Sequence, residues 1–221
     1  VQQSKLMTPI SNDRNQRFIQ LANRRQPDWT VILENVSDWH NIGAIMRSCD
    51  AVGIGDIYVL YSDLEFRPGK IGLGKRTTAG TRKWVQVHYY ENLDACFSAV
   101  RKRYGIIYST YLQTGSDNPS LYELDFVQPG AYLFGNEHQG VSPEAASKSD
   151  GNFIIPQQGM VGSLNISVAC AVTLFEGMRQ RLLAGKYPDS QELLPQAEIY
   201  YEKYLDLQRK RLERLPIVEE E

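Results

Sequence analysis

The chain has 221 residues, with 24 Lys and Arg against 26 Asp and Glu, and a formal net charge of −2. This length suits one ordinary globular domain with arms at its ends. Hydrophobic residues make up 42% of the chain and charged residues 23%, so a disordered chain, a collagen and a disulfide scaffold are excluded as overall descriptions. No apolar run approaches the length of about 18 residues that a membrane-spanning helix needs.

Three cysteines, Cys49, Cys96 and Cys170, lie far apart and share no CxxC spacing. This pattern indicates neither a zinc knuckle nor a disulfide framework, and we expect small core residues in a reduced compartment. The N-terminal residues lack the apolar core of a secretion signal, so we expect a cytoplasmic protein. The three histidines have no ligand-like companion at short spacing, and no metal site is expected.

Apolar patterning predicts strands that alternate with helices. A polar helix is predicted over 12–26, a buried strand over 30–36 and a helix with apolar residues at helical spacing over 41–52. Residues 62–82 are rich in Gly, Thr, Arg and Lys and predict a long loop. Further strands are predicted over 56–60, 84–88, 106–110, 131–134 and 153–155, and further helices over 91–104, 164–183 and 190–214. The alternation predicts an α/β fold with a mostly parallel sheet.

Positive charge is concentrated in three segments of the chain. Residues 1–26, 67–83 and 203–214 together hold 16 of the 24 Lys and Arg but only three of the 26 Asp and Glu. Any one segment could be an ordinary solvated face. Three segments with the same bias favour a polyanionic partner.

Three predicted strand ends are polar or rich in glycine, and ligands gather at the carboxyl ends of strands in such sheets. The first strand ends in Glu34-Asn35 and leads to a helix on which Asn41 is expected to be the N-cap, with Arg47 almost two turns later. Residues 134–142 place a carboxylate between two glycines, although a plain turn with a helix cap at Ser142 would give the same pattern. Residues 155–165 form a flexible loop that runs into a helix of small residues.

These three segments carry a resemblance to a known family. LENVSDWHNIGAIMRSCDAVG, LFGNEHQGVS and IPQQGMVGSLNISVACAVTLFE resemble motifs one, two and three of the SPOUT superfamily of methyltransferases. The most similar group is TrmH (SpoU), the tRNA guanosine-2′-O-ribose methyltransferases. The resemblance covers about residues 20–188.

The resemblance implies an α/β SPOUT domain with a deep trefoil knot, which binds S-adenosylmethionine and works as a homodimer. With the charge and helix patterns at the two ends, we expect a basic helical arm over 1–26, the methyltransferase domain over 27–188 and a helical extension over 189–221. The residues that match the cofactor pocket are Thr110, Gly135, Ile155 and Leu164. Those that match the active site are Asn41, Arg47, Glu137, Ser163 and Asn165. The cations expected to bind RNA are Arg14, Arg17, Arg24, Arg25, Lys75, Arg76 and Arg82.

The implied reaction is 2′-O-methylation of a ribose in tRNA, at guanosine 18 of the D-loop by analogy with the family. Arg47 matches the residue proposed as the base in the family, but a guanidinium is essentially never deprotonated in proteins. Clamping a phosphate and stabilising the developing alkoxide is an equally good role for it. Ribosomal RNA as the substrate, and a knotted RNA-binding protein without catalysis, stay open as alternatives.

Residues 69–76 nearly match a nucleotide-binding P-loop. They place Arg76 where Ser or Thr would bind magnesium, and they do not directly follow a strand. A basic loop that contacts RNA is the favoured interpretation.

Overall fold

The computed structural model describes residues 10–67, 80–112, 118–160 and 162–212. The chain divides into two compact units, one of Val1–Arg25 with Tyr187–Glu221 and the other of Gln26–Lys186. The predicted RNA contacts Lys75 and Arg76, and the whole P-loop-like segment 69–76, lie outside the described residues. The three-part division of the chain stays a prediction. None of the helices in the described part combines the length and the hydropathy that a membrane span requires.

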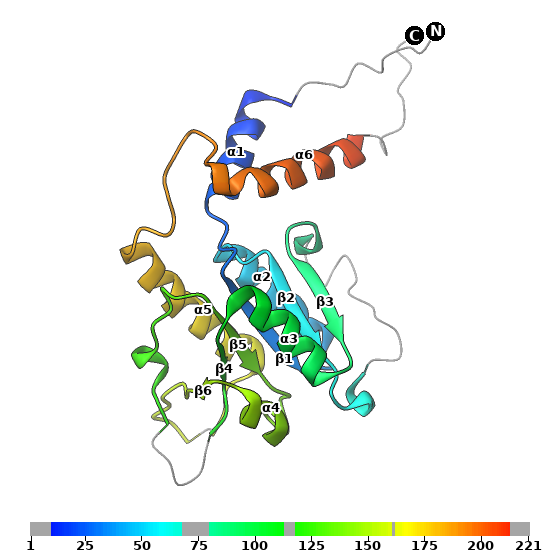
Figure 1. The fold of residues 1–221 in the computed structure, drawn as a ribbon, viewed down its shortest axis with the longest axis vertical. Helices are drawn as coiled ribbons and strands as arrows, with labels where there is room; N and C mark the ends of the chain where they lie inside the picture. The colour runs from blue at the N-terminus through cyan, green and yellow to red at the C-terminus, as the bar shows by residue number, and fades with distance from the viewer. Residues whose placement is uncertain (1–9, 68–79, 113–117, 161, 213–221) are drawn as a thin grey trace. The chain divides into compact units, whose positions relative to one another are not determined.

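The larger unit is built on a six-stranded sheet with the order β3-β2-β1-β5-β4-β6 (Figure 1). Each neighbouring pair of these strands is parallel. The predicted α/β fold with a parallel sheet is therefore confirmed, while the knot stays a prediction. The strands are β1 Trp29–Glu34, β2 Asp56–Leu60, β3 Gln86–Tyr90, β4 Ile107–Ser109, β5 Gly130–Phe134 and β6 Gly151–Asn152.

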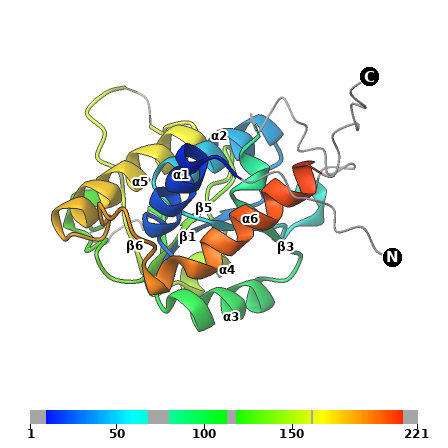
Figure 2. The ribbon, with the colours of Figure 1, turned by 90° about the horizontal axis from the view of Figure 1, so that it is seen from above.

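Helices cover both faces of the sheet (Figure 2). The helices α2 (Trp39–Ala51) and α5 (Ile166–Leu183) pack together on one face, and α3 (Leu93–Tyr104) lies on the other. Successive side chains of a strand point to opposite faces, so Val31 and Leu33 join the core under α2 and α5 while Ile32 joins the core under α3. Both faces of β1 are buried, and four of its six residues are apolar.

The cysteines are small core residues, as predicted. All three are buried free thiols. Burial, with the Cys170 thiol beside it, raises the pKa of Cys49 well above its ordinary value, and burial raises the pKa of Cys96 to about 12. Thiols of this kind are not reactive at neutral pH, because the thiolate is the nucleophile.

The smaller unit pairs helix α1 (Asn12–Asn23) with helix α6 (Glu198–Leu212). The Phe18 and Tyr204 rings lie 5.7 Å apart. The predicted helix over 190–214 starts too early, because the Asn23 amide holds the backbone of residues 190–194 in a non-helical form. Pro195 then opens a short 3-10 helix, η4 (Pro195–Ala197), and the residue before a proline is disfavoured in the helical region.

Two other predicted elements differ from the structure. The strand predicted over 153–155 is displaced, because β6 covers Gly151–Asn152 and Ile154 forms only an isolated bridge, to Ser120. From the sequence, only a helix cap at Ser142 was expected. The structure has a short helix there, α4 (Pro143–Lys148), and the Ser142 hydroxyl caps it by accepting from the Ala145 N–H at 3.1 Å. Short 3-10 helices η1 (Leu64–Phe66), η2 (Thr81–Lys83) and η3 (Leu121–Glu123) occupy parts of the loops.

Candidate active site

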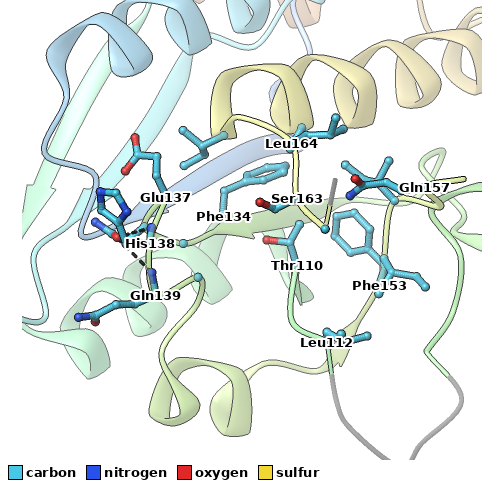
Figure 3. A pocket seen from close by; sticks show the side chains of 18 residues that line it. Thr110, Leu112, Phe134, Glu137, His138, Gln139, Phe153, Gln157, Ser163 and Leu164 are labelled. Atoms are coloured by element: carbon cyan, nitrogen blue, oxygen red, sulfur yellow. Dashed lines mark hydrogen bonds between the residues drawn. The ribbon is translucent and has the colours of Figure 1, made fainter. Parts of the chain in front are cut away.

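A cavity of about 490 Å³ lies at the carboxyl ends of β4 and β5, and the segment before α5 forms another of its walls (Figure 3). Its volume lies in the range of small-molecule sites. The structure brings six of the predicted site residues to this one cavity: Thr110, Gly135, Glu137, Ile155, Ser163 and Leu164.

The loop after β5 closes on itself directly beside the cavity. Asn136 and Gly140 exchange two backbone hydrogen bonds, of 3.0 and 2.8 Å, and the Asn136 Oδ1 accepts from the His138 and Gln139 N–H groups. A Cβ atom at Gly135 would lie 2.0 Å from the Gly140 carbonyl carbon, so only glycine allows this closure. The closed loop holds Glu137 at the cavity edge.

A chain of side-chain hydrogen bonds joins the three predicted motifs. The Asn165 Nδ2 donates to the Asn41 Oδ1 at 3.2 Å, and the Asn41 Nδ2 donates to the Glu137 Oε1 at 2.6 Å. These bonds require the Glu137 oxygen to be an acceptor and fix the orientation of the Asn41 amide. Three residues from distant parts of the sequence are thus joined, and of these Glu137 lines the cavity while Asn41 and Asn165 do not.

The prediction that Asn41 is the N-cap of its helix is wrong. The N-cap is Asp38, whose side chain accepts from the His40 N–H at 2.8 Å. Asn41 lies in the first turn, and its amide is free to bond across to Glu137. Asn165 is the cap of α5, because its Oδ1 accepts from the Ser167 N–H.

Arg47 is exposed on α2 and is not among the residues that line the cavity. The predicted role of Arg47 in the site therefore stays a prediction.

The predicted RNA-binding cations fall into two groups. Arg17, Arg24 and Arg82 are exposed and Arg14 is half-buried. Arg25 is buried at 7% exposure, and its Nε donates to the Tyr204 hydroxyl at 2.5 Å. Because this guanidinium is used to join α6 to the end of α1, the structure favours a structural role for Arg25 rather than an RNA contact.

Two residues that contact the loop after β5 were given no role from the sequence. They are Glu34 and Asn35, at the end of β1. The Glu34 carboxylate accepts from the Ser142 N–H, and the Asn35 carbonyl oxygen accepts from the Asn136 Nδ2. The signal in the sequence is the polar pair Glu34-Asn35 at the end of a mainly apolar strand, noted above without a role for either side chain.

The lining residues fit S-adenosylmethionine in their chemistry. Phe134, Phe153 and Leu164 offer apolar walls for a purine, and Glu137 offers a carboxylate for a molecule that carries a sulfonium and an ammonium group. No group of three His, Cys, Asp or Glu side chains in the described ranges is arranged to hold a metal ion.

Comparison with known proteins identifies the family. Residues 28–175 match the model of the SpoU rRNA Methylase family. The chain belongs to the SpoU methylase family. A curated member from Thermus thermophilus, a tRNA (guanosine(18)-2′-O)-methyltransferase, is 42% identical over 197 residues, which is 89% of this chain and 96% of the relative.

Two solved structures extend the comparison. The A. aeolicus TrmH/SpoU tRNA modifying enzyme is 33% identical with a TM-score of 0.73, covering 88% of this chain and 97% of that one. An AdoMet-bound rRNA methyltransferase from Sinorhizobium meliloti is 26% identical with a TM-score of 0.58, covering 72% of this chain and 59% of that one. The SpoU methylase sheet described above is shared with both.

Proposed function

We propose that this SpoU methylase transfers the methyl group of S-adenosylmethionine to the ribose 2′-hydroxyl of guanosine 18 in tRNA. One observation carries the proposal: the match to a tRNA (guanosine(18)-2′-O)-methyltransferase over 96% of that relative. The structure adds a cavity whose lining suits the cofactor.

The chemistry assigns a task to each part of the site. S-adenosylmethionine supplies an electrophilic methyl group when bound. Thr110, Gly135, Ile155 and Leu164 would hold the cofactor, since they line the cavity. A ribose hydroxyl is a weak acid, so its proton must leave as the new bond forms. The task of the chain is to orient the hydroxyl and to stabilise its developing charge.

The polar side chains at the cavity would hold the nucleotide. Asn41 and Glu137 offer hydrogen-bonding groups that are already oriented by each other, and Ser163 and Asn165 lie exposed on the segment before α5. A guanidinium is essentially never deprotonated in proteins, so we assign Arg47 to the phosphate next to the target ribose and to the developing alkoxide.

Among the alternatives, ribosomal RNA has less support than tRNA. The chain matches the tRNA relative over nearly the whole of that protein, but it spans 59% of the S. meliloti rRNA methyltransferase. A non-catalytic RNA-binding protein would not need the joined side chains of Asn41, Glu137 and Asn165.

Incubation with total tRNA and a labelled methyl donor is expected to place the label on a single 2′-O-methylguanosine. Nucleoside mapping locates it, and a transcript with 2′-deoxyguanosine at the target position is the matched control, because it lacks the accepting hydroxyl. Label found in ribosomal RNA instead would favour the rRNA alternative, and no label with bound cofactor would favour the non-catalytic one.

The exposed cations Arg17, Arg24 and Arg82 and the half-buried Arg14 are proposed to bind the tRNA, together with Lys75 and Arg76. Phosphate contacts of this kind weaken with salt because counterions are released on binding. The cytoplasmic location expected from the sequence stays a prediction.

We further propose a homodimer that uses α5. Val168, Phe175 and Leu182 are 47%, 52% and 51% exposed, and they are spaced seven residues apart on that helix. Residues seven apart lie on one face of a helix, so the three form an apolar stripe, as expected of a surface that packs against a second copy.

Phe175→Glu is expected to convert the dimer to a monomer, because it places a charge in the middle of the stripe. Analytical ultracentrifugation at micromolar concentration measures the change. Leu64→Glu is the matched control, since Leu64 is 60% exposed on η1, a different element from α5. A wild-type chain that sediments as a monomer would contradict the proposed dimer.

A further inference from the structure

Glu34 carries a buried carboxylate at the carboxyl end of a central strand, close to the loop that borders the cavity. It has no exposed surface, and it ends β1, the strand between β2 and β5. Three donors reach its two oxygens. The Ser142 N–H donates to Oε2 at 2.9 Å, and the hydroxyls of Ser142 and Ser62 donate to Oε1 at 2.7 and 2.8 Å.

The surroundings show that Glu34 acts as an acceptor in all three bonds. The Ser142 Oγ already accepts from the Ala145 N–H, and the Ser62 Oγ already accepts from the Asn35 Nδ2. Each hydroxyl hydrogen is therefore available to donate to Glu34. The two carboxyl oxygens of Glu34 thus accept three hydrogen bonds, and a buried polar group needs such partners.

The neighbouring residue holds the other end of the same loop. The Asn136 Nδ2 donates to the Asn35 carbonyl oxygen at 2.8 Å. Asn35 is a non-glycine residue with a positive φ of 56°, and its own side chain bonds the segment after β2. The consecutive residues Glu34 and Asn35 thus anchor the two ends of residues 136–142, and Glu137 lies between the two anchors.

We propose that Glu34 is a positioning residue for methyl transfer, which sets the place of Glu137 by holding the far end of its loop through Ser142. This inference rests on the proposed function. Glu34 does not line the cavity, so it acts through the loop. A displacement of about 1 Å in a reacting group can cost about 10²-fold in rate, which is enough for a buried anchor to matter.

Glu34→Gln tests the proposal with little change in volume. Whichever way the amide is turned, its NH2 group replaces an acceptor, so at least one of the three donors loses its partner. We expect kcat for tRNA methylation to fall about 10- to 100-fold. We also expect faster backbone amide hydrogen exchange over residues 136–142 in the free protein, a readout that needs neither substrate nor turnover.

Thr30→Val is the matched control for stability. Thr30 is equally buried on the same strand, and its hydroxyl donates to the Asp56 carbonyl oxygen at 2.7 Å, towards the opposite end of β1. This variant is expected to lower the melting temperature about as much as Glu34→Gln, while kcat and exchange over 136–142 stay near the wild-type values.

The double variant Glu34→Gln/Glu137→Gln separates positioning from stability. If Glu34 acts through Glu137, the double variant is no slower than Glu137→Gln alone, because groups that act as a unit are not additive. Additive losses, or unchanged exchange over 136–142 in Glu34→Gln, would overturn the proposal. A wild-type protein that does not methylate tRNA would instead contradict the proposed function, and the exchange measurement would still decide the role of Glu34.

Discussion

Arg47→Ala is expected to lower kcat for tRNA methylation by about 10²- to 10³-fold, the cost typical of removing one group that stabilises developing negative charge. The affinity for S-adenosylmethionine is expected to stay at the wild-type value. Arg47 is exposed on α2 and does not line the cavity of its own chain, so the cofactor site loses nothing when the side chain is removed. Single-turnover kinetics and calorimetry measure the two quantities separately.

Two further variants sharpen this test. Arg47→Lys keeps the charge but loses the planar fork that binds a phosphate with two hydrogen bonds, so an intermediate kcat is expected. Lys102→Ala removes an exposed cation from α3, on the other face of the sheet, and is expected to leave kcat unchanged. Wild-type turnover by Arg47→Ala would remove Arg47 from the mechanism.

Gly135→Ala is expected to abolish measurable cofactor binding. The added Cβ would lie 2.0 Å from the Gly140 carbonyl carbon and from the Val141 nitrogen. These are backbone atoms that cannot move aside as a flexible side chain can, so the loop beside the cavity must open. Overpacking of this kind costs about 1–3 kcal/mol. Calorimetry with S-adenosylmethionine and thermal denaturation measure the two effects.

Gly159→Ala is the matched control for this variant, because a Cβ there meets no atom within 4 Å. It is expected to bind the cofactor with the wild-type affinity and to unfold at the wild-type temperature. If Gly135→Ala bound the cofactor as tightly as Gly159→Ala, the closed loop after β5 would not be needed for the site.

The elements that sequence reasoning placed well are those that bury a continuous apolar pattern. The strand β1 is buried on both faces, and α2 carries Ile42, Ile45, Met46 and Cys49 at helical spacing. Periodicity reports burial, and burial defines these elements. The errors came where another part of the chain competes for the backbone, as Asn23 does for residues 190–194 and Ser120 does for Ile154.

The candidate site, like the fold, was predicted from the sequence only in part. Motif resemblance selected Thr110, Gly135, Ser163 and Leu164, which the structure gathers at one cavity. The sequence could not show that Arg25 is hydrogen-bonded to Tyr204, because a buried arginine cannot be told from an exposed one in a polar segment.

The amino-acid sequence determined the parallel α/β layers and the three loops proposed to form the site, since both follow from local apolar patterns and from residues close together in the chain. Only the tertiary structure decided that Asn41 bonds Glu137 rather than capping its helix, and that Glu34 anchors the loop at Ser142. These pairs are 96 and 108 residues apart. Hydrogen bonds act over about 3 Å, so such partners can be known only once the sheet has brought the strand ends together.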